Sequence, residues 1–389
     1  MGLWARLTAL SALAGTGLAV VSGAAGWDTA HRVLAGLALP PLAALAAIAW
    51  VSARRLLPAT LASLLLFGLA ALLTGPVIHL AAASLTFAAT AYAAALTFRG
   101  RVEPGPMRDY VTLTKPRIMS LLLLTGAAGV FVGAGGVPGF GAFAATMAGL
   151  ALACGGASAL NHYLDRDIDR LMGSRTEARP VASGRVEPAR ALEFGLALSA
   201  FSFVLLDSLV NLPTALLALG GNLFYVIVYT RWLKRSTPQN IVIGGAAGAV
   251  PPLVGYAGAA GHLGFAAVVM FVIVFVWTPP HFWALALMIK EHYARAKVPM
   301  LPVARGDAET AKQIVRYTLV LIAVTLAPVA LGTFGVVYGI AALVLGALFL
   351  VLAVQLRRSL ERSAAVKLFH YSLLYLALLF VAMAVDVVL

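Results

Sequence analysis

Apolar residues fall in long blocks along the chain, and short polar segments separate one block from the next. Each block approaches the length that a helix needs to cross a bilayer, about 17–25 residues. The blocks are rich in leucine, alanine, valine and glycine without strict alternation, which argues against a β-barrel. The pattern predicts about thirteen transmembrane helices, near residues 4–25, 31–53, 56–75, 77–98, 117–135, 139–162, 190–210, 212–230, 239–260, 264–289, 313–332, 335–355 and 368–388.

The composition agrees with this interpretation. Of the 389 residues, 61% are hydrophobic and 11% are charged, whereas a soluble domain carries roughly 25% charged residues. Cys154 is the only cysteine, which excludes an internal disulfide and a multi-cysteine metal site. The basic residues behind the net charge of +13 sit in short loops, so they do not indicate a nucleic-acid partner. We expect an all-α, multi-pass protein embedded in membrane lipid.

The basic residues also predict an orientation in the cytoplasmic (plasma) membrane. With a cytoplasmic N-terminus, 27 of the 28 lysines and arginines fall on the inner side of the predicted helices, and only Arg32 falls outside. This asymmetry satisfies the positive-inside rule. The long charged loops at 163–189, 231–238 and 290–312 then face the cytoplasm, and the C-terminus lies outside. We therefore expect the chemistry on the cytoplasmic side.

A polar segment rich in proline and glycine, Gly100–Pro116, is the best candidate for a domain boundary. It divides the chain into a four-helix transmembrane bundle at residues 1–100, a linker at 101–116 and a nine-helix domain at 117–389.

The strongest chemical signal is an acidic motif at the end of a predicted membrane helix. Asn161, Asp165 and Asp169 are spaced i, i+4, i+8 and share one helix face, whereas Asp167 is turned away. Carboxylates one turn apart repel each other, and their oxygens suit Mg²⁺ bound together with a substrate phosphate. Acids at a membrane edge are functional candidates. The alternative is a solvated helix end whose acids pair with Arg166, Arg170 and Arg175.

Two nearby polar segments carry the bases that a diphosphate needs. One follows the acidic motif, and the other runs from Tyr229 to Asn240. Arginine offers phosphate a forked pair of donors, and lysine offers a point charge. The alternative is that any one of these bases is present only because cytoplasmic loops of membrane proteins are enriched in lysine and arginine. The candidates for catalysis or diphosphate binding are Arg175, Arg179, Tyr229, Lys234, Arg235 and Lys297, with Gln239 and Asn240 as substrate contacts.

A third region lies within an apolar block, where Pro279-Pro280 predicts a break or kink in the helix. His281, Trp277 and Trp283 flank the prolines and are candidate contacts for a large flat substrate. Their aromatic faces would also stabilise a carbocation. The alternative is a buried histidine that is hydrogen-bonded to a neighbouring helix.

At these residues the chain resembles the intramembrane UbiA-type prenyltransferases. The matching strings are NHYLDRDIDRLM, RTEARPVASGRV, LKRSTPQNIVIGGAAGAVPPLVGYAG, WTPPHFWALAL and HYARAKVPMLPV, which occur in the family's order between residue 109 and the C-terminal region. The LKRSTPQN and TPPHFWALAL strings are specific to the haem branch of the family, the protohaem IX farnesyltransferases (haem O synthases).

The resemblance implies a nine-helix bundle that transfers a farnesyl group from farnesyl diphosphate to a vinyl group of haem b. In this view Asn161, Asp165 and Asp169 hold Mg²⁺, and Arg179 and Lys234 steady the phosphates. Water then completes the hydroxyfarnesyl side chain of haem O. The rival hypotheses are a UbiA-type enzyme acting on a quinone-precursor ring and a haem carrier without catalytic activity.

The chain departs from the family pattern at one point. The family's second acidic motif usually reads Asp-Tyr where this chain has His292-Tyr293, next to Glu291. The sequence leaves open whether Glu291 substitutes as a metal ligand or whether the second metal is held differently, with Asp307 as one option.

Residues 1–100 lie outside the prenyltransferase resemblance. The predicted topology places His31 and His79 at similar depth near the outer face, with Arg32 beside His31. Two facing histidines in a four-helix bundle are candidate axial ligands for haem b, and Arg32 is a candidate partner for a propionate. The alternative is two helix-end histidines at the interface. The Ala30–Ala35 stretch resembles half of a haem A synthase, which suggests that enzyme as a partner.

Overall fold

The computed structural model describes residues 107–389 and, before them, only residues 8–16, 38, 41–46, 60, 61, 63, 64, 86 and 90. The four-helix bundle expected over residues 1–100 therefore lies mostly outside the described residues. The candidate haem ligands His31 and His79, and Arg32, lie outside them as well.

Within residues 107–389 the chain folds into helices and contains no strand. Nine helical stretches are long and apolar enough to span a membrane, which confirms the nine-helix expectation for this part of the chain. They are α6 (Pro116–Ala134), α7 (Phe140–Leu164), α9 (Pro188–Leu209), α10 with η3 and α11 (Leu212–Ser236), α12 with α13 (Asn240–Ala260), α14 (Phe265–Met288), α16 (Leu301–Ala330), α17 (Val336–Ser359) and α18 (Arg362–Val388).

Two of these stretches are built from consecutive segments, and short helices precede the first stretch or lie between others. The fourth stretch consists of α10 (Leu212–Leu223), the π-helix η3 (Phe224–Leu233) and α11 (Lys234–Ser236), and the fifth of α12 (Asn240–Gly248) and α13 (Val250–Ala260). The short helices are α5 (Met107–Leu113), α8 (Arg166–Leu171), η2 (Gly173–Arg175) and α15 (Lys290–Arg295).

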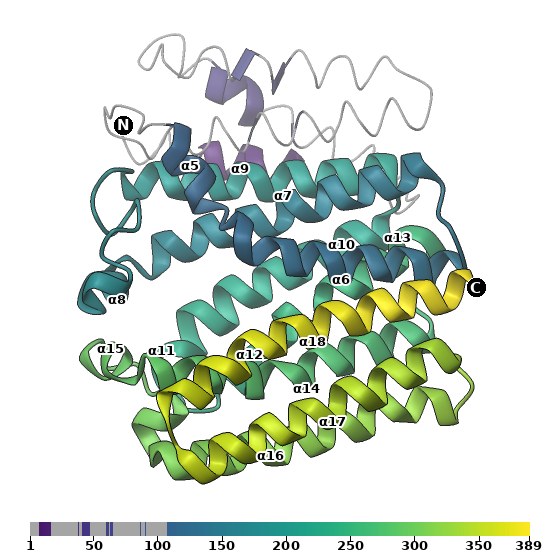
Figure 1. Ribbon diagram of the computed structural model, residues 1–389. Coiled ribbons are helices and arrows are strands. Elements are labelled where there is room, and N and C mark those ends of the chain that lie inside the picture. Colours follow the sequence, from purple (N-terminus) through teal and green to yellow (C-terminus); the bar gives the residue numbers. More distant parts are fainter. Residues whose placement is uncertain are drawn as a thin grey trace.

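The two ends of the bundle differ in their charge and in the length of the segments that connect the helices there. Helices α8, α11 and α15 gather at one end, on the left of Figure 1, and the C-terminus lies at the opposite end. We call the first the carboxylate end; it comprises residues 107–117, 165–187, 231–239, 289–305 and 357–362. All lysines and arginines of residues 107–389 lie in these segments or in the neighbouring helical turns. The charge asymmetry expected from the sequence is therefore present in the fold.

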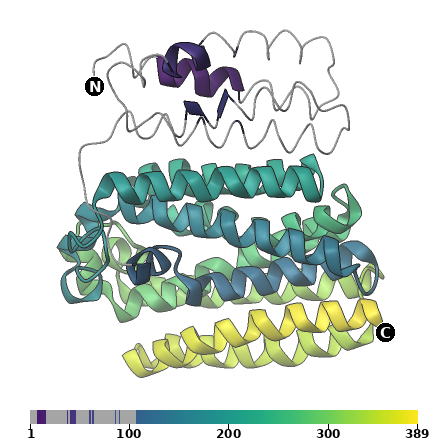
Figure 2. The ribbon, with the colours of Figure 1, turned by 90° about the horizontal axis from the view of Figure 1, so that it is seen from above.

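The membrane helices pack closely where glycine replaces larger side chains. A Cβ atom added at Gly129 would collide with the carbonyl of Pro252, and one at Gly255 would collide with the carbonyl of Gly126. Helices α6 and α13 therefore touch backbone to backbone, as small residues allow in membrane proteins. Figure 2 shows the long helices running roughly side by side through the bundle.

Helix α17 shows how the apolar pattern is divided between the core and the surface. Tyr338, Ala342, Phe349 and Ala353 are buried in a cluster with α14, α16 and α18. The face opposite exposes large apolar side chains, as expected for a helix that faces lipid: Ile340, Leu343, Val344, Leu348 and Val351. Because both faces are apolar, the surrounding solvent of this helix is hydrocarbon rather than water.

Helix α16 begins earlier than the hydropathy pattern predicts. The pattern places its start near residue 313, whereas the helix begins at Leu301 and is kinked at Gly306, whose backbone angles of φ 79° and ψ 170° are not helical. Residues 305–312 include Arg305, Asp307, Glu309 and Lys312, so a search for apolar residues excludes them. This part of α16 belongs to the charged end of the bundle.

Candidate active site

The acidic motif lies where α7 passes into α8. Helix α7 ends at Asp165, which has φ −88° and ψ 3°. The Asp165 N–H still donates to the Asn161 carbonyl at 2.8 Å, and the Asp169 N–H donates to the Asp165 carbonyl at 2.8 Å. The helical direction continues, and Asn161, Asp165 and Asp169 are all buried. Asp167 points away, with 58% of its side chain exposed. The spacing predicted this division between one buried face and one exposed residue.

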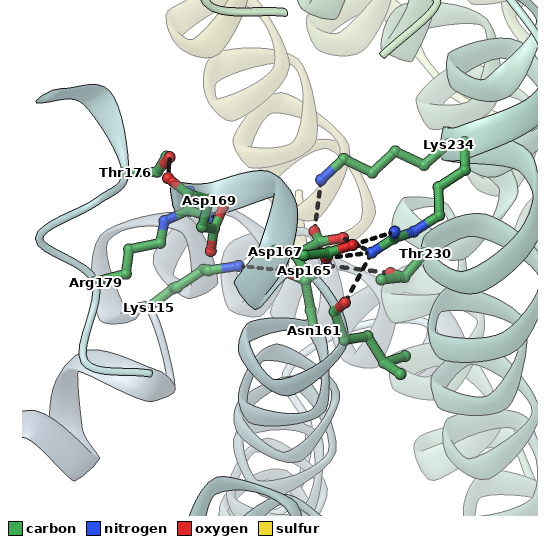
Figure 3. A network of polar contacts seen from close by, with 11 residues as sticks. Lys115, Asn161, Asp165, Asp167, Asp169, Thr176, Arg179, Thr230 and Lys234 are labelled. Carbon is green, nitrogen blue, oxygen red and sulfur yellow. Dashed lines mark hydrogen bonds and ion pairs between the residues drawn. The ribbon is translucent and has the colours of Figure 1, made fainter. Parts of the chain in front are cut away.

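Asp165 lies at the centre of the network (Figure 3). Its Oδ2 accepts a hydrogen bond from Lys234 Nζ at 2.5 Å and another from Asn161 Nδ2 at 2.8 Å. Its Oδ1 is buried and has no hydrogen-bond partner, although Arg235 Nη2 lies 3.9 Å away. Lys234 is itself largely buried. The pair is thus a buried ion pair, and removing either member would leave an uncompensated charge.

Asn161 links the motif to two more elements. Lys115 Nζ donates to its Oδ1 at 2.7 Å, and its Nδ2 approaches Thr230 Oγ1 at 3.1 Å. Lys115 precedes α6 and has a left-handed backbone, with φ 51°. Burial lowers the pKa of Lys115 to about 7, and the nearby Arg179 acts in the same direction. The sequence reasoning missed Lys115, because nothing distinguishes it from other loop bases except its place directly before a helix.

Asp169 is bound to the loop that follows it. Arg179 Nη1 donates to Asp169 Oδ1 at 2.7 Å, and Thr176 Oγ1 donates to the Asp169 carbonyl at 2.7 Å. Asp169 Oδ2 is buried without a hydrogen-bond partner. Burial raises the pKa of Asp169 above its ordinary value, although Arg179 acts in the opposite direction.

The loop that carries Arg179 is fixed at two further points. Arg185 donates to both carboxylate oxygens of Asp109 on α5, at 3.2 and 3.0 Å from its Nε, and to the Ala178 carbonyl at 2.9 Å. Arg170 Nε donates to the Ala182 carbonyl at 2.9 Å. The position of Arg179 is therefore determined by contacts on both sides of it.

Asp167 and Arg235 form a separate, more exposed pair. Arg235 Nη1 and Nη2 donate to the two Asp167 oxygens at 2.6 and 2.7 Å, and Nη2 also donates to the Leu164 carbonyl at 2.8 Å. The hydrogen bonds from Arg235 lower the pKa of Asp167 to about 2. Arg235, expected as a diphosphate ligand, is thus occupied by Asp167 in this structure.

The π-helix η3 places three of the site residues. Its wider turn carries Tyr229 and Thr230 and leads directly into Lys234. The Tyr229 ring stacks on Tyr225, with centroids 5.5 Å apart, and lies against Gly244, where an added Cβ atom would collide with it. π-helical turns are rare and occur frequently at functional sites. No pattern in the sequence predicted this one.

The motif fits a divalent cation. Asp165 Oδ1 and Asp169 Oδ2 are buried acceptors without hydrogen-bond partners, and such atoms are costly unless a ligand or ion satisfies them. Carboxylate oxygens are ligands that Mg²⁺ prefers. The alternative pairing expected for a solvated helix end does not occur as stated. Arg166 donates to the Tyr163 carbonyl, Arg170 donates to the backbone, and Arg175 is exposed.

Several predicted site residues lie apart from this network. Glu291, Lys297 and Gln239 are exposed. In residues 107–389 and the earlier described stretches, no three His, Cys, Asp or Glu side chains lie close enough together to hold a metal, so Glu291 does not join Asp165 and Asp169. His292 Nδ1 lies 2.7 Å from the Met172 carbonyl. Asn240 is fully buried, and neither polar atom of its side chain has a hydrogen-bond partner.

His281 lies in an aromatic stack between α14 and α18. Its ring centroid is 4.4 Å from that of Trp277 and 4.8 Å from that of Phe369. Helix α14 continues through Pro279 and Pro280, so the break that was one of the two expected outcomes does not occur. Thr278 Oγ1 donates to the Val274 carbonyl at 2.8 Å. Trp283 instead packs edge-on against Tyr317 on α16, with centroids 5.2 Å apart. The ring of Trp277 therefore stacks on His281, whereas the ring of Trp283 contacts Tyr317 instead.

The tautomer of His281 follows from its neighbours. Ser372 Oγ donates to the Phe369 carbonyl at 2.6 Å, so its proton is used there. It must therefore accept from His281 Nδ1, which lies 2.6 Å away. An imidazole with its proton on Nδ1 keeps a lone pair on Nε2. His281 can thus accept a proton or bind a metal atom through Nε2.

The sequence and the fold were compared with known proteins. The profile of the UbiA prenyltransferase family matches residues 122–381. A protein from Symbiobacterium thermophilum named protoheme IX farnesyltransferase is 53% identical over 292 residues, covering 74% of this chain and 97% of that protein. A protein of the same name from Azorhizobium caulinodans is 50% identical, covering 72% of this chain and 92% of its own length.

One relative extends further towards the N-terminus. A protoheme IX farnesyltransferase from Chloroflexus aurantiacus is 46% identical over 344 residues and covers 85% of this chain and 58% of its own length. Residues 107–389 make up only about 73% of the chain, so this alignment reaches into the residues before 107.

Solved structures support the same fold. A digeranylgeranylglyceryl phosphate synthase structure superposes with a TM-score of 0.61 at 18% identity, covering 72% of this chain and 98% of that one. A UbiA homolog from Archaeoglobus fulgidus, determined with DMAPP and Mg²⁺, gives a TM-score of 0.50 at 18% identity, covering 71% and 99%. At these identities the structures show the fold alone. The sequence profile and the relatives at 46–53% identity show that this multi-pass membrane protein belongs to the UbiA prenyltransferase family.

Proposed function

We propose that this chain transfers the farnesyl group of farnesyl diphosphate to a vinyl group of haem b and so makes haem O. The relatives at 50–53% identity that carry the name protoheme IX farnesyltransferase support this assignment. The observation that carries it is the motif itself. Asp165 and Asp169 are buried one helical turn apart, each with one oxygen hydrogen-bonded to a base and the other left without a hydrogen-bond partner.

In this proposal Asp165 and Asp169, with Asn161 beside them, hold Mg²⁺ against the diphosphate. When bound, the cation offsets the negative charge that develops on the leaving diphosphate and so favours cleavage of the allylic C–O bond. Lys234, Arg179 and Lys115 already point their donors at the motif, and they would shift part of their hydrogen bonding from the side chains to the phosphates.

The acceptor side of the reaction is proposed around His281. Its Nε2 lone pair is suited to bind the iron of haem b, and the hydrogen bond of Nδ1 to Ser372 would fix the ring orientation, as for most metal-bound histidines. Phe282, the next residue, belongs to the same apolar cluster as Tyr229 of the diphosphate side. The farnesyl cation adds to the vinyl group, and water then supplies the hydroxyl group and loses a proton.

The orientation is also a proposal. All lysines and arginines of residues 107–389 lie at the carboxylate end, and the positive-inside rule places such an end in the cytoplasm. In the cytoplasmic membrane of a bacterium, the N-terminus and the active site would face inward and the C-terminus outward. Cysteine labelling from outside intact cells would test this, because a cysteine introduced at Leu389 should react and one introduced at Ser236 should not.

The experiment for the main proposal uses the full chain in membranes. Supplied with haem b, farnesyl diphosphate and Mg²⁺, the membranes should form haem O, detected by mass spectrometry. An isoprenylated quinone precursor formed instead of haem O would favour the rival enzyme. Full function of an Asp165→Ala variant in cells would favour a haem carrier.

We propose a separate role for the N-terminal region, which the structure does not describe at these residues: His31 and His79 bind a haem b, with Arg32 beside them. Such a site would hold haem near a haem A synthase partner. The full chain should then show a low-spin bis-histidine spectrum that His31→Ala or His79→Ala removes, while farnesyl transfer continues. An unchanged spectrum in both variants would contradict this role.

A further inference from the structure

His162 lies inside the acidic motif and makes none of the hydrogen bonds of its network. Its side chain is 2% exposed, and neither ring nitrogen has a hydrogen-bond partner among the described residues. Buried polar atoms are usually hydrogen-bonded, and leaving one without a partner costs free energy. His281, the other buried histidine in the described part of the chain, differs because its Nδ1 is bonded to Ser372. His162 thus keeps both nitrogens for a ligand.

The helix geometry places His162 on the face of α7 that carries the motif. Residues three and four apart are neighbours on a helix surface, so His162 lies between Ser158, one turn before it, and Asp165, one turn after it. Ser158 Oγ donates to the last carbonyl of α5 at 2.7 Å, and Asn161 Oδ1 accepts from Lys115 Nζ at 2.7 Å. The imidazole therefore lies on the side of α7 that faces Lys115 and the acids of the motif.

The charges around the ring favour an anion as its ligand. The charged groups that act most strongly on His162 are all bases, namely Lys115, Arg179 and Lys234. The same bases donate hydrogen bonds to Asn161 and to the two buried aspartates of the motif. Mg²⁺ takes oxygen ligands in preference to imidazole, so a cation here belongs to the carboxylates. A ring N–H among three bases is instead suited to a phosphate oxygen.

We propose that His162 is a further ligand of the substrate diphosphate and donates a ring N–H to one of its phosphate oxygens. This inference rests on the proposed function. An imidazole carries at least one N–H in either protonation state, so the contact does not require the ring to be charged. Bound diphosphate would then satisfy a nitrogen that the protein itself leaves without a partner.

The test measures affinity for the diphosphate separately from affinity for haem. The purified full chain is titrated, in the presence of Mg²⁺, with the thiolo analogue of farnesyl diphosphate, in which sulfur replaces the bridging oxygen and slows ionisation. His162→Phe keeps a ring of similar size without an N–H. We expect it to bind the analogue about 10- to 100-fold more weakly, the effect of one hydrogen bond to a charged group. The affinity for haem b, followed by its absorption spectrum, should stay unchanged.

Amide variants test whether the N–H is what matters. His162→Asn and His162→Gln place an amide N–H near the positions of Nδ1 and Nε2, so at least one of them should recover part of the affinity for the analogue. His262→Phe is the matched control, because His262 is exposed and lies outside the carboxylate end. It should bind the analogue as the wild type does.

Four results would overturn the inference and leave the proposed function intact. One is an unchanged affinity of His162→Phe for the analogue, and another is a failure of both amide variants to recover affinity. A third is an equal loss of affinity for haem b, which would show that the ring supports the fold. The fourth is a nitrogen coupling to bound Mn²⁺, seen by electron paramagnetic resonance and removed in His162→Phe, which would assign the ring to the cation. Failure of the wild type to bind the analogue would contradict the proposed function as well.

Discussion

The ends of α7 and α14 lie at the same end of the bundle, and a short helix follows each of them, yet they differ in their chemistry. The α7 end buries Asp165 and Asp169 and surrounds them with Lys234, Arg179 and Lys115. The α14 end leaves Glu291 exposed and joins His292 to a backbone carbonyl. The α7 end thus holds two carboxylate oxygens that lack hydrogen-bond partners, whereas the α14 end is joined by His292 to the turn after α8.

This difference shows how a membrane protein can place acids at a helix end without losing stability. Each buried carboxylate is half compensated by a base from another element, which limits the cost of burial. The remaining oxygens stay without partners until an ion arrives. The site is therefore assembled in advance and leaves two buried carboxylate oxygens for an ion.

The largest effect is expected from removing the central acid. Asp165→Asn should lower kcat about 10³-fold or more, because it removes a ligand for the ion that offsets leaving-group charge. The change also leaves Lys234 buried without its partner, which costs about 3–5 kcal/mol. Haem O formation followed by mass spectrometry gives the rate, and thermal unfolding in detergent gives the stability.

Asp167→Asn is the matched control for that change. Asp167 lies two residues away, on α8, but it is exposed, and its partner Arg235 lies 3.9 Å from Asp165 Oδ1 without a hydrogen bond to it. Its loss should change the rate by no more than a few-fold, since exposed ion pairs contribute about 0–1 kcal/mol. Equal losses in the two variants would show that the contrast between the buried Asp165 and the exposed Asp167 is irrelevant.

The next largest effect concerns Lys234, the base that is hydrogen-bonded to Asp165. Lys234→Ala should reduce kcat/KM for farnesyl diphosphate about 10²-fold, as removal of one donor to a developing negative charge usually does. Lys234→Arg should recover only part of this, because a planar guanidinium does not reproduce a point charge in a site fitted to an ammonium. Steady-state kinetics at saturating haem b separate these effects, and a rate within twofold of the wild type in Lys234→Ala would contradict the assignment.

A smaller effect should follow from disturbing the π-helix from outside. Gly244→Ala places a Cβ atom in the space of the Tyr229 ring, and overpacking of this kind costs about 1–3 kcal/mol. We expect a lower thermal midpoint and a roughly tenfold lower rate as Tyr229 and Lys234 shift together. Gly248→Ala, on the same helix with no atom within 4 Å of the added Cβ, is the control. If the two variants behave alike, the packing of Tyr229 on α12 is not important.

The sequence foresaw the parts of the site that depend on spacing within one helix. The i, i+4, i+8 positions of Asn161, Asp165 and Asp169 required only that the helical direction continue through residue 165, and it does. The apolar blocks placed α6 within one residue of its observed bounds for the same reason, since hydrophobic length determines a membrane span.

The parts that depend on contacts between helices were not predictable. Lys115 and Ser372 lie 46 and 91 residues along the chain from the side chains that they contact, and neither belongs to a motif. Arg235 was expected to bind diphosphate, and its charge alone could not predict its pair with the exposed Asp167. The π-helix was missed because its wider turn has no sequence signature.

The smallest expected effect is a dependence on pH. Lys115 has a pKa of about 7, so its ammonium is charged below that pH and neutral above it. The kcat/KM for farnesyl diphosphate, which reports the free enzyme, should therefore fall as pH rises through about 7, by up to roughly tenfold near pH 8. Arginine stays charged over this pH range, so Lys115→Arg should remove the fall of kcat/KM above pH 7. If kcat/KM falls above pH 7 in Lys115→Arg as it does in the wild type, another group, such as the diphosphate itself, is responsible for the pH dependence.

The most direct measurement of the central claim is the position of the ion. Crystals of the full chain, grown with Mn²⁺ and the thiolo analogue of farnesyl diphosphate, would show the metal by its anomalous scattering. We predict an anomalous peak at Asp165 Oδ1 and Asp169 Oδ2, with oxygen ligands at about 2.0–2.2 Å, close to the distances of Mg²⁺. A peak beside Glu291 and His292 instead, or an analogue bound with no peak at the α7 end, would contradict the account.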